Sequence, residues 1–214
     1  MIKWLFIILA VVILGLLSLA IWVTQTEKSQ HAKNSLRLQN AEPNITLDAK
    51  TAVVVFSRSG NTGVLANHIA QKHNAELFEI TATDYELGIP GWIAALNDAR
   101  SNVATITPSN INLEKYHTIY LGSPIWLYSP APPIWQFAKN NDFSGKNVIL
   151  FNTFNSKFEQ YFIDDFEKLV RANGAKTFSH RYVNRGRMGS QISSQDMLDK
   201  FDSPYGHDSR TCEK

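Results

Sequence analysis

The sequence has very few of the residues that build disulfides or metal centres. Its one cysteine, Cys212, lies near the C-terminal end and can form neither an internal disulfide nor a cysteine-rich metal site. The six histidines do not follow the spacing of metal ligands, so we predict no metal site. The chain also lacks a run of lysine or arginine, and its formal net charge is only +2. We therefore expect no nucleic-acid partner.

Charge is also missing from residues 4–23, which read WLFIILAVVILGLLSLAIWV. At about 1.5 Å per residue, a helix of this length spans roughly 30 Å, the thickness of the hydrocarbon core of a bilayer. Trp4 and Trp22 lie at its two ends, where indole rings favour the headgroup region. We predict a single-pass transmembrane anchor over residues 1–23.

A cleaved signal peptide is the alternative to this anchor. Lys3 would be its positively charged start, and the small residues around Ala20 would form the cleavage site. For an anchor, the positive residues Lys28, Lys33 and Arg37 that follow the apolar run favour a cytoplasmic soluble domain. The sequence leaves both readings open.

The rest of the chain divides by composition into a linker, a domain and a tail. Residues 24–50 are polar and without an apolar period, which predicts a flexible linker. Residues 51–203 have the patterns of a folded domain, and residues 204–214 form a C-terminal tail.

Strand and helix patterns alternate along this domain. Runs rich in β-branched and aromatic residues predict five strands, at residues 52–56, 75–80, 118–121, 148–151 and 176–183. Helical spacing predicts helices between them, including an apolar stripe of Trp92, Leu96, Ala99 and Val103. Such alternation predicts an α/β fold whose parallel sheet is covered on both faces and binds ligands beyond the C-terminal ends of its strands.

The loop after the first predicted strand has the composition of a phosphate cradle. Residues 57–62, Ser-Arg-Ser-Gly-Asn-Thr, lead into a helix N-terminus, where free backbone N–H groups and the helix dipole favour an anion. Three hydroxyls add donors, and Gly60 permits close backbone approach. The same residue types also form ordinary capped turns, which is the alternative reading.

Two further loops follow the third and fourth predicted strands. Residues 122–128 place Trp126 on a loop stiffened by Pro124, which suits stacking on a flat aromatic ligand. The alternative is that Trp126 packs on the next helix. Residues 152–156 would face the other side of that ligand.

These loops resemble those of the flavodoxin-like flavoproteins. F-S-R-S-G-N-T looks like the flavodoxin phosphate loop, and Y-L-G-S-P-I-W followed by F-S-G-K-N-V-I-L-F-N-T is similar to the loops that border the flavin. The resemblance covers residues 51–184. It implies a five-stranded parallel sheet of order 2-1-3-4-5, with helices on both faces, preceded by the transmembrane helix.

The resemblance also implies a cofactor and a site. The expected cofactor is FMN, with its phosphate on residues 57–62 and its ring between the second and third loops. The implied cofactor-binding residues are Ser57, Arg58, Ser59, Gly60, Asn61, Thr62, Ser123, Pro124, Ile125, Trp126, Thr153, Phe154 and Asn155. Many relatives have glycines and a serine where Phe154 and Asn155 stand, so we expect hydrogen bonding to the flavin ring and the redox potential to differ here.

The expected function is electron transfer at a membrane surface, with a protein or a quinone as redox partner. No catalytic acid or base is assigned, because the flavin supplies the chemistry. One alternative is an FMN-dependent oxidoreductase of the NAD(P)H-dependent quinone or flavin reductase type. Another is a flavin-free interaction module tethered to the membrane.

Overall fold

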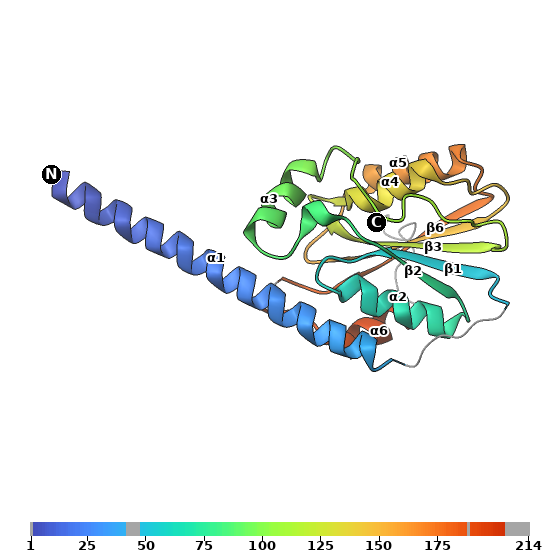
Figure 1. The fold of residues 1–214 in the computed structure, drawn as a ribbon, viewed down its shortest axis with the longest axis horizontal. Coiled ribbons are helices and arrows are strands. Elements are labelled where there is room, and N and C mark those ends of the chain that lie inside the picture. The colour runs from blue at the N-terminus through green and yellow to red at the C-terminus, as the bar shows by residue number, and fades with distance from the viewer. Residues whose placement is uncertain (1, 42–47, 188, 204–214) are drawn as a thin grey trace, which may run out of the picture.

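The computed structural model describes residues 2–41, 48–187 and 189–203. Its core is a sheet of five parallel strands with the order β2-β1-β3-β5-β6 (Figure 1). These strands are β1 (Thr51–Phe56), β2 (Glu76–Ile80), β3 (Thr118–Trp126), β5 (Asn147–Phe154) and β6 (Thr177–Asn184). Counted without β4, this is the predicted order 2-1-3-4-5.

The described part of the sheet has six strands, so the predicted number of five is wrong. The additional strand, β4 (Ser129–Pro130), pairs antiparallel with the end of β3. β3 continues to Trp126 instead of ending at the expected Leu121, and a tight turn at Leu127 and Tyr128 leads back. Both turn residues have positive φ, a rare conformation for bulky side chains, so this turn has none of the usual Gly or Asn residues that would predict it.

Helices cover both faces of the sheet. α2 (Asn61–Lys72) and α6 (Ser194–Asp202) lie on one face, and α3 (Ile89–Asp98), α4 (Pro132–Asn140) and α5 (Gln160–Ala172) lie on the other (Figure 1). A single 3₁₀ turn, η1 (Thr83–Tyr85), precedes α3. In β1, Val54 and Phe56 pack into the core below one set of helices, while Val53 and Val55 pack below the other. Burial on both faces explains the continuous apolar run of this strand.

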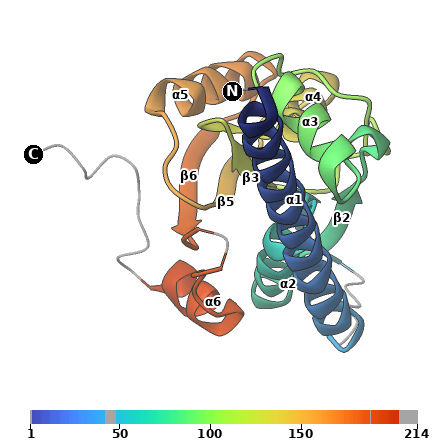
Figure 2. The ribbon, with the colours of Figure 1, turned by 90° about the vertical axis from the view of Figure 1, so that its left-hand side faces the viewer.

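The N-terminal helix α1 (Ile2–Gln39) is longer than predicted. Residues 24–39, expected to be a flexible linker, are helical and run alongside α2 (Figure 2). The prediction of a flexible linker is therefore wrong for residues 24–39, because polar contacts hold this segment against the domain. The two buried residues of α1 are Glu27 and Asn34, and both bond to the domain. Polar contacts of this kind leave no hydrophobic period in the sequence.

The prediction that an apolar stripe buries α3 is also wrong in part. Of its four members, only Ala99 is buried, whereas Trp92, Leu96 and Val103 are exposed. The helix packs against the domain through small residues, Gly91 and Ala95 among them.

Candidate functional site

A cavity of about 250 Å³ lies at the C-terminal ends of β1, β3 and β5. Parallel α/β sheets bind their ligands at this edge. All of the predicted site residues line it, except Gly60 and Ser123. The three loops that the sequence singled out therefore meet at one site.

The first loop contributes hydroxyl and amide groups to the cavity wall. Ser57, Ser59, Asn61 and Thr62 line it, and the turn leads directly into the N-terminus of α2. Gly60 is the N-cap residue of α2, with a φ of 85° that favours glycine. This loop end and the dipole of α2 can bind an anion.

The turn at Gly60 lies directly beneath α1. A Cβ atom built on Gly60 would lie 2.6 Å from the Cβ of Asn34, closer than real side chains approach. The Asn34 amide donates hydrogen bonds to the Ser59 carbonyl at 2.9 Å and to Asn61 Oδ1 at 2.8 Å. Gly60 is thus covered by α1 instead of facing the cavity.

A hydrogen bond ties the first loop to the third. The hydroxyls of Thr62 and Thr153 lie 2.8 Å apart, and both residues are buried. Ser123 is also fully buried, and its Oγ accepts from Asn152 Nδ2 at 3.1 Å and from Ala131 N at 3.3 Å. Ser123 thus connects β3 to β5 and to the start of α4 and does not reach the cavity.

Trp126 has contacts on both the core and the cavity. Its ring meets those of Phe56 and Tyr85 edge to face, with centroids 5.5 Å and 5.1 Å apart. It also lines the cavity beside Pro124 and Ile125, at the end of β3. Trp126 can therefore pack against the core and also contact a ligand in the cavity.

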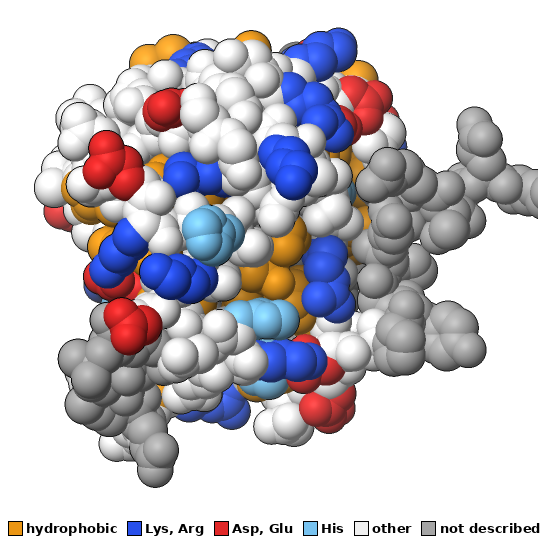
Figure 3. Space-filling view, turned by 90° about the vertical axis from the view of Figure 1, so that its right-hand side faces the viewer, with side chains coloured by type: hydrophobic (Ala, Val, Ile, Leu, Met, Phe, Trp, Pro, Cys, Tyr) orange, Lys and Arg blue, Asp and Glu red, His pale blue; other side chains and the backbone are white. Residues whose placement is uncertain are grey.

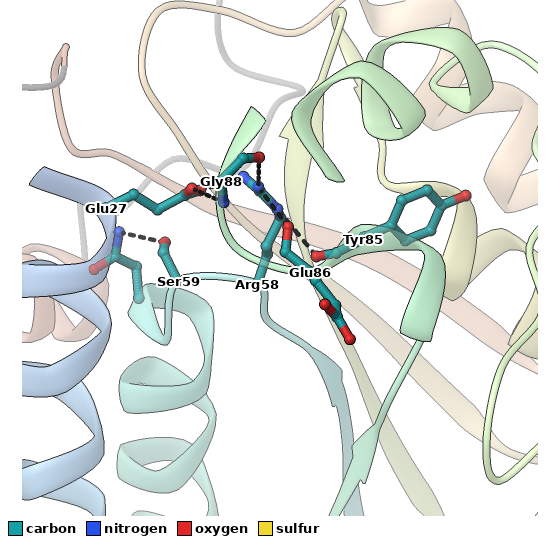
Figure 4. Close-up of polar contacts among 7 residues, drawn as sticks. Glu27, Arg58, Ser59, Tyr85, Glu86 and Gly88 are labelled. Carbon is teal, nitrogen blue, oxygen red and sulfur yellow. Dashed lines mark hydrogen bonds and ion pairs between the residues drawn. The ribbon is translucent and has the colours of Figure 1, made fainter. Parts of the chain in front are cut away.

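Arg58 lines the cavity, but its guanidinium donates to other partners (Figure 4). It forms a buried ion pair with Glu27 of α1. Its Nε donates to the Tyr85 carbonyl at 3.1 Å, and its Nη2 donates to the carbonyls of Glu86 and Gly88 at 2.8 Å and 3.1 Å. Burial lowers the pKa of Arg58, and the Glu27 carboxylate opposes that shift. Arg58 thus fastens α1 and the segment before α3 to the first loop.

Several cavity residues have no counterpart in the sequence-based prediction. They are Glu27, Gln30, Trp92, Ala95, Leu96, Leu127, Arg185 and Gln191. The α1 residues belong to the segment that was predicted to be a linker. Trp92 and Leu96 belong to the predicted apolar stripe, and Ala95 lies between them on α3. Arg185 and Gln191 follow β6, beyond the three loops in which a ligand was sought.

Arg185 tests whether the cavity fits an anionic group. Its side chain is buried, and its Nη2 donates a hydrogen bond to the Ile192 carbonyl at 3.0 Å. Among the described residues, no hydrogen-bond partner exists for its Nε and Nη1. Burial, and then the charge of Arg37, lower the pKa of Arg185. A buried guanidinium without a counter-charge is unfavourable, so this site is complementary to a phosphate or carboxylate.

The comparisons with known proteins agree with this geometry. The flavodoxin family model matches residues 50–173, more than half of the chain, and the chain therefore belongs to the flavodoxin family. Among curated proteins, no match is found.

Solved structures confirm the flavodoxin-like fold. A protein from Bacteroides uniformis ATCC 8492, classed as a flavoprotein, has a TM-score of 0.57 and 24% identity over 72% of this chain and 99% of its own. A flavoprotein from Lactobacillus acidophilus NCFM, crystallised in complex with FMN, has a TM-score of 0.51 and 21% identity, again over 72% and 99% of the two chains.

Proposed function

We propose that this protein binds FMN without a covalent bond and transfers electrons at a membrane surface. The observation that carries the proposal is the cavity itself. It combines the phosphate-cradle residues of the first loop, the buried guanidinium of Arg185 and the indole of Trp126. The FMN complex of the Lactobacillus acidophilus protein, which has the same fold, supports this choice of ligand.

The parts of the cavity suit the parts of FMN. The first loop, the N-terminus of α2 and Arg185 would hold the phosphate, as donors of charge-assisted hydrogen bonds. Residues 124–126 and 153–155 would border the isoalloxazine ring from its two sides. The flavin would supply the electron-transfer chemistry, while these residues fix its position and limit access of water.

The membrane attachment is proposed from α1. It is the one helix in the described part of the chain that is long and apolar enough to span a bilayer, and its apolar residues are exposed. A signal sequence passes the same test. We favour an anchor over residues 1–23, with the domain of residues 51–203 on the cytoplasmic side, because more positive residues follow the apolar run than precede it.

The test is a visible absorption spectrum of the full-length protein, purified in mild detergent, before and after addition of FMN. We expect the flavin bands to shift on binding and FMN to bind more tightly than FAD, because the first loop provides one phosphate cradle. A protein that leaves the FMN spectrum unchanged would contradict the proposal. Oxidation of NAD(P)H in the presence of a quinone would then distinguish a reductase from a passive carrier.

A further inference from the structure

α3 exposes its large apolar side chains to the surroundings. Four of them form a stripe at positions i, i+3, i+4 and i+7 of the helix, and each is between 38% and 54% exposed: Ile89, Trp92, Ile93 and Leu96. These four residues are called the apolar stripe of α3. The residues that α3 turns inward are small, namely Gly91 and Ala95. A surface helix of a water-soluble protein has the opposite arrangement.

The start of α3 is fixed next to the end of the apolar part of α1. The backbone N–H of Gly88, the N-cap residue of α3, donates to Glu27 Oε2 at 3.1 Å. Arg58 holds both residues, through an ion pair to Glu27 and a hydrogen bond to the Gly88 carbonyl (Figure 4). Glu27 follows the last apolar residue, Val23, by about one helical turn, or roughly 6 Å.

The views of the whole molecule agree with these contacts. α3 lies on the side of the domain from which the N-terminal part of α1 projects (Figure 1) and runs beside α1 when that side faces the viewer (Figure 2). Trp22 also reaches the domain, because a Cβ atom on Gly189 would lie 3.7 Å from its indole. The folded domain therefore lies, in space, directly next to the end of the apolar run of α1. The opposite side of the domain carries Lys, Arg, Asp and Glu side chains spread across its surface (Figure 3).

We propose that the apolar stripe of α3 lies in the interfacial region of the same bilayer that α1 spans. This inference rests on the membrane anchor of the proposed function. Lipid is the favoured occupant because the stripe is continuous with the apolar run of α1 and contains Trp92, a residue type that prefers the interface. Trp92 and Leu96 also line the cavity. The proposal therefore places one wall of the cavity at the lipid surface.

The experiment places a fluorescent label at three single-cysteine positions of the full chain, in a Cys212→Ser background. Ile93→Cys probes the stripe, and Leu14→Cys probes the middle of the proposed span. Lys176→Cys is the control, because Lys176 is exposed just before the start of β6. It therefore lies at the N-terminal ends of the parallel strands, opposite the end that carries the cavity. Each protein carries an environment-sensitive dye and is reconstituted into phosphatidylcholine vesicles, with or without lipids that carry a nitroxide quencher.

We expect lipid-borne nitroxides to quench the labels at positions 14 and 93 several-fold more than the label at position 176. Equal access of aqueous iodide to positions 93 and 176 would overturn the inference while leaving the anchor intact. Shielding of position 93 from both quenchers would also overturn it, because a protein would then cover the stripe. If position 14 were not quenched by lipid, the anchor would fail and this inference with it.

Discussion

The two halves of α1 show opposite relations between polarity and burial. The apolar half, residues 2–23, is almost entirely exposed, although it contains the most hydrophobic residues of the chain. The polar half, residues 24–39, contains the two buried residues of the helix, Glu27 and Asn34. Within the described residues, the apolar half touches the domain at Trp22, next to Gly189, whereas the polar half is hydrogen-bonded to the first loop of the cavity.

The difference shows that hydrophobicity predicts burial only when the surroundings are water. An exposed apolar helix is stable if lipid surrounds it. A buried carboxylate or amide is tolerated if it has hydrogen-bond partners. Here Arg58 pairs with the Glu27 carboxylate, and the Ser59 carbonyl accepts from the Asn34 amide. One continuous helix can therefore have one half suited to lipid and the other half as a wall of the cavity.

The largest effect is expected from removal of the apolar half of α1, which should release the protein from the membrane. Apolar residues at the centre of a membrane span each contribute about 0.3–0.6 kcal/mol, which sums to roughly 5–10 kcal/mol over such a run. The full chain should stay in the membrane fraction after carbonate extraction, whereas a chain that begins at Thr24 should not. A mature N-terminus at Ile21 would show instead that the apolar half is a cleaved signal.

The next largest effect concerns the ion pair in the polar half. Arg58→Met leaves the buried Glu27 carboxylate without its partner and should lower the free energy of unfolding by about 3–5 kcal/mol. Lys168→Met is the control, because Lys168 forms an exposed pair with Asp165 at 2.7 Å, and its loss should leave the stability nearly unchanged. Chemical unfolding in detergent micelles measures both. Equal losses would mean that α1 does not depend on this contact.

Trp126→Ala should weaken FMN binding by about 1–3 kcal/mol, because the indole lines the cavity. It should also lower stability, since contacts with Phe56 and Tyr85 are lost. Trp135→Ala provides the comparison, because Trp135 is buried in α4 and does not line the cavity. That variant should lose stability alone. If Trp126→Ala also left the FMN affinity unchanged, the flavin would not lie beside β3.

The smallest effect is expected at Asp202 of α6, whose carboxylate contacts Lys72 and His68 of α2. Burial raises the pKa of Asp202, but hydrogen bonds from Lys72 and His68 outweigh it, and the net shift is downward. A lowered carboxyl pKa stabilises the fold above its unfolded value of about 3.9, and this contribution disappears as pH falls through the folded pKa. Asp202→Asn should thus cost under about 1 kcal/mol at neutral pH, and this cost should disappear as the pH falls through the folded pKa. A loss that persisted at low pH would point to packing instead of charge.

The sheet could be predicted from the sequence because its signals are local. Val53 to Phe56 show by themselves that β1 is buried on both faces, and the loop motifs lie at the ends of such strands. The wall formed by α1 could not be predicted. Its burial depends on partners such as Arg58 and Ser59, which lie far along the chain. The hairpin after Trp126 was missed because bulky residues occupy the turn.

The most direct test of the proposed FMN site is whether the cavity recognises the phosphate of FMN. The measurement is a titration of the full-length protein and its Arg185→Gln variant with FMN and with riboflavin, which lacks the phosphate. We expect the wild type to prefer FMN. The variant should lose about 1.5–3 kcal/mol of FMN binding, or roughly 10- to 150-fold in affinity, because a hydrogen bond to a charged group is lost. Its riboflavin affinity should not change. Equal affinities of the wild type for the two flavins would contradict the proposed phosphate site.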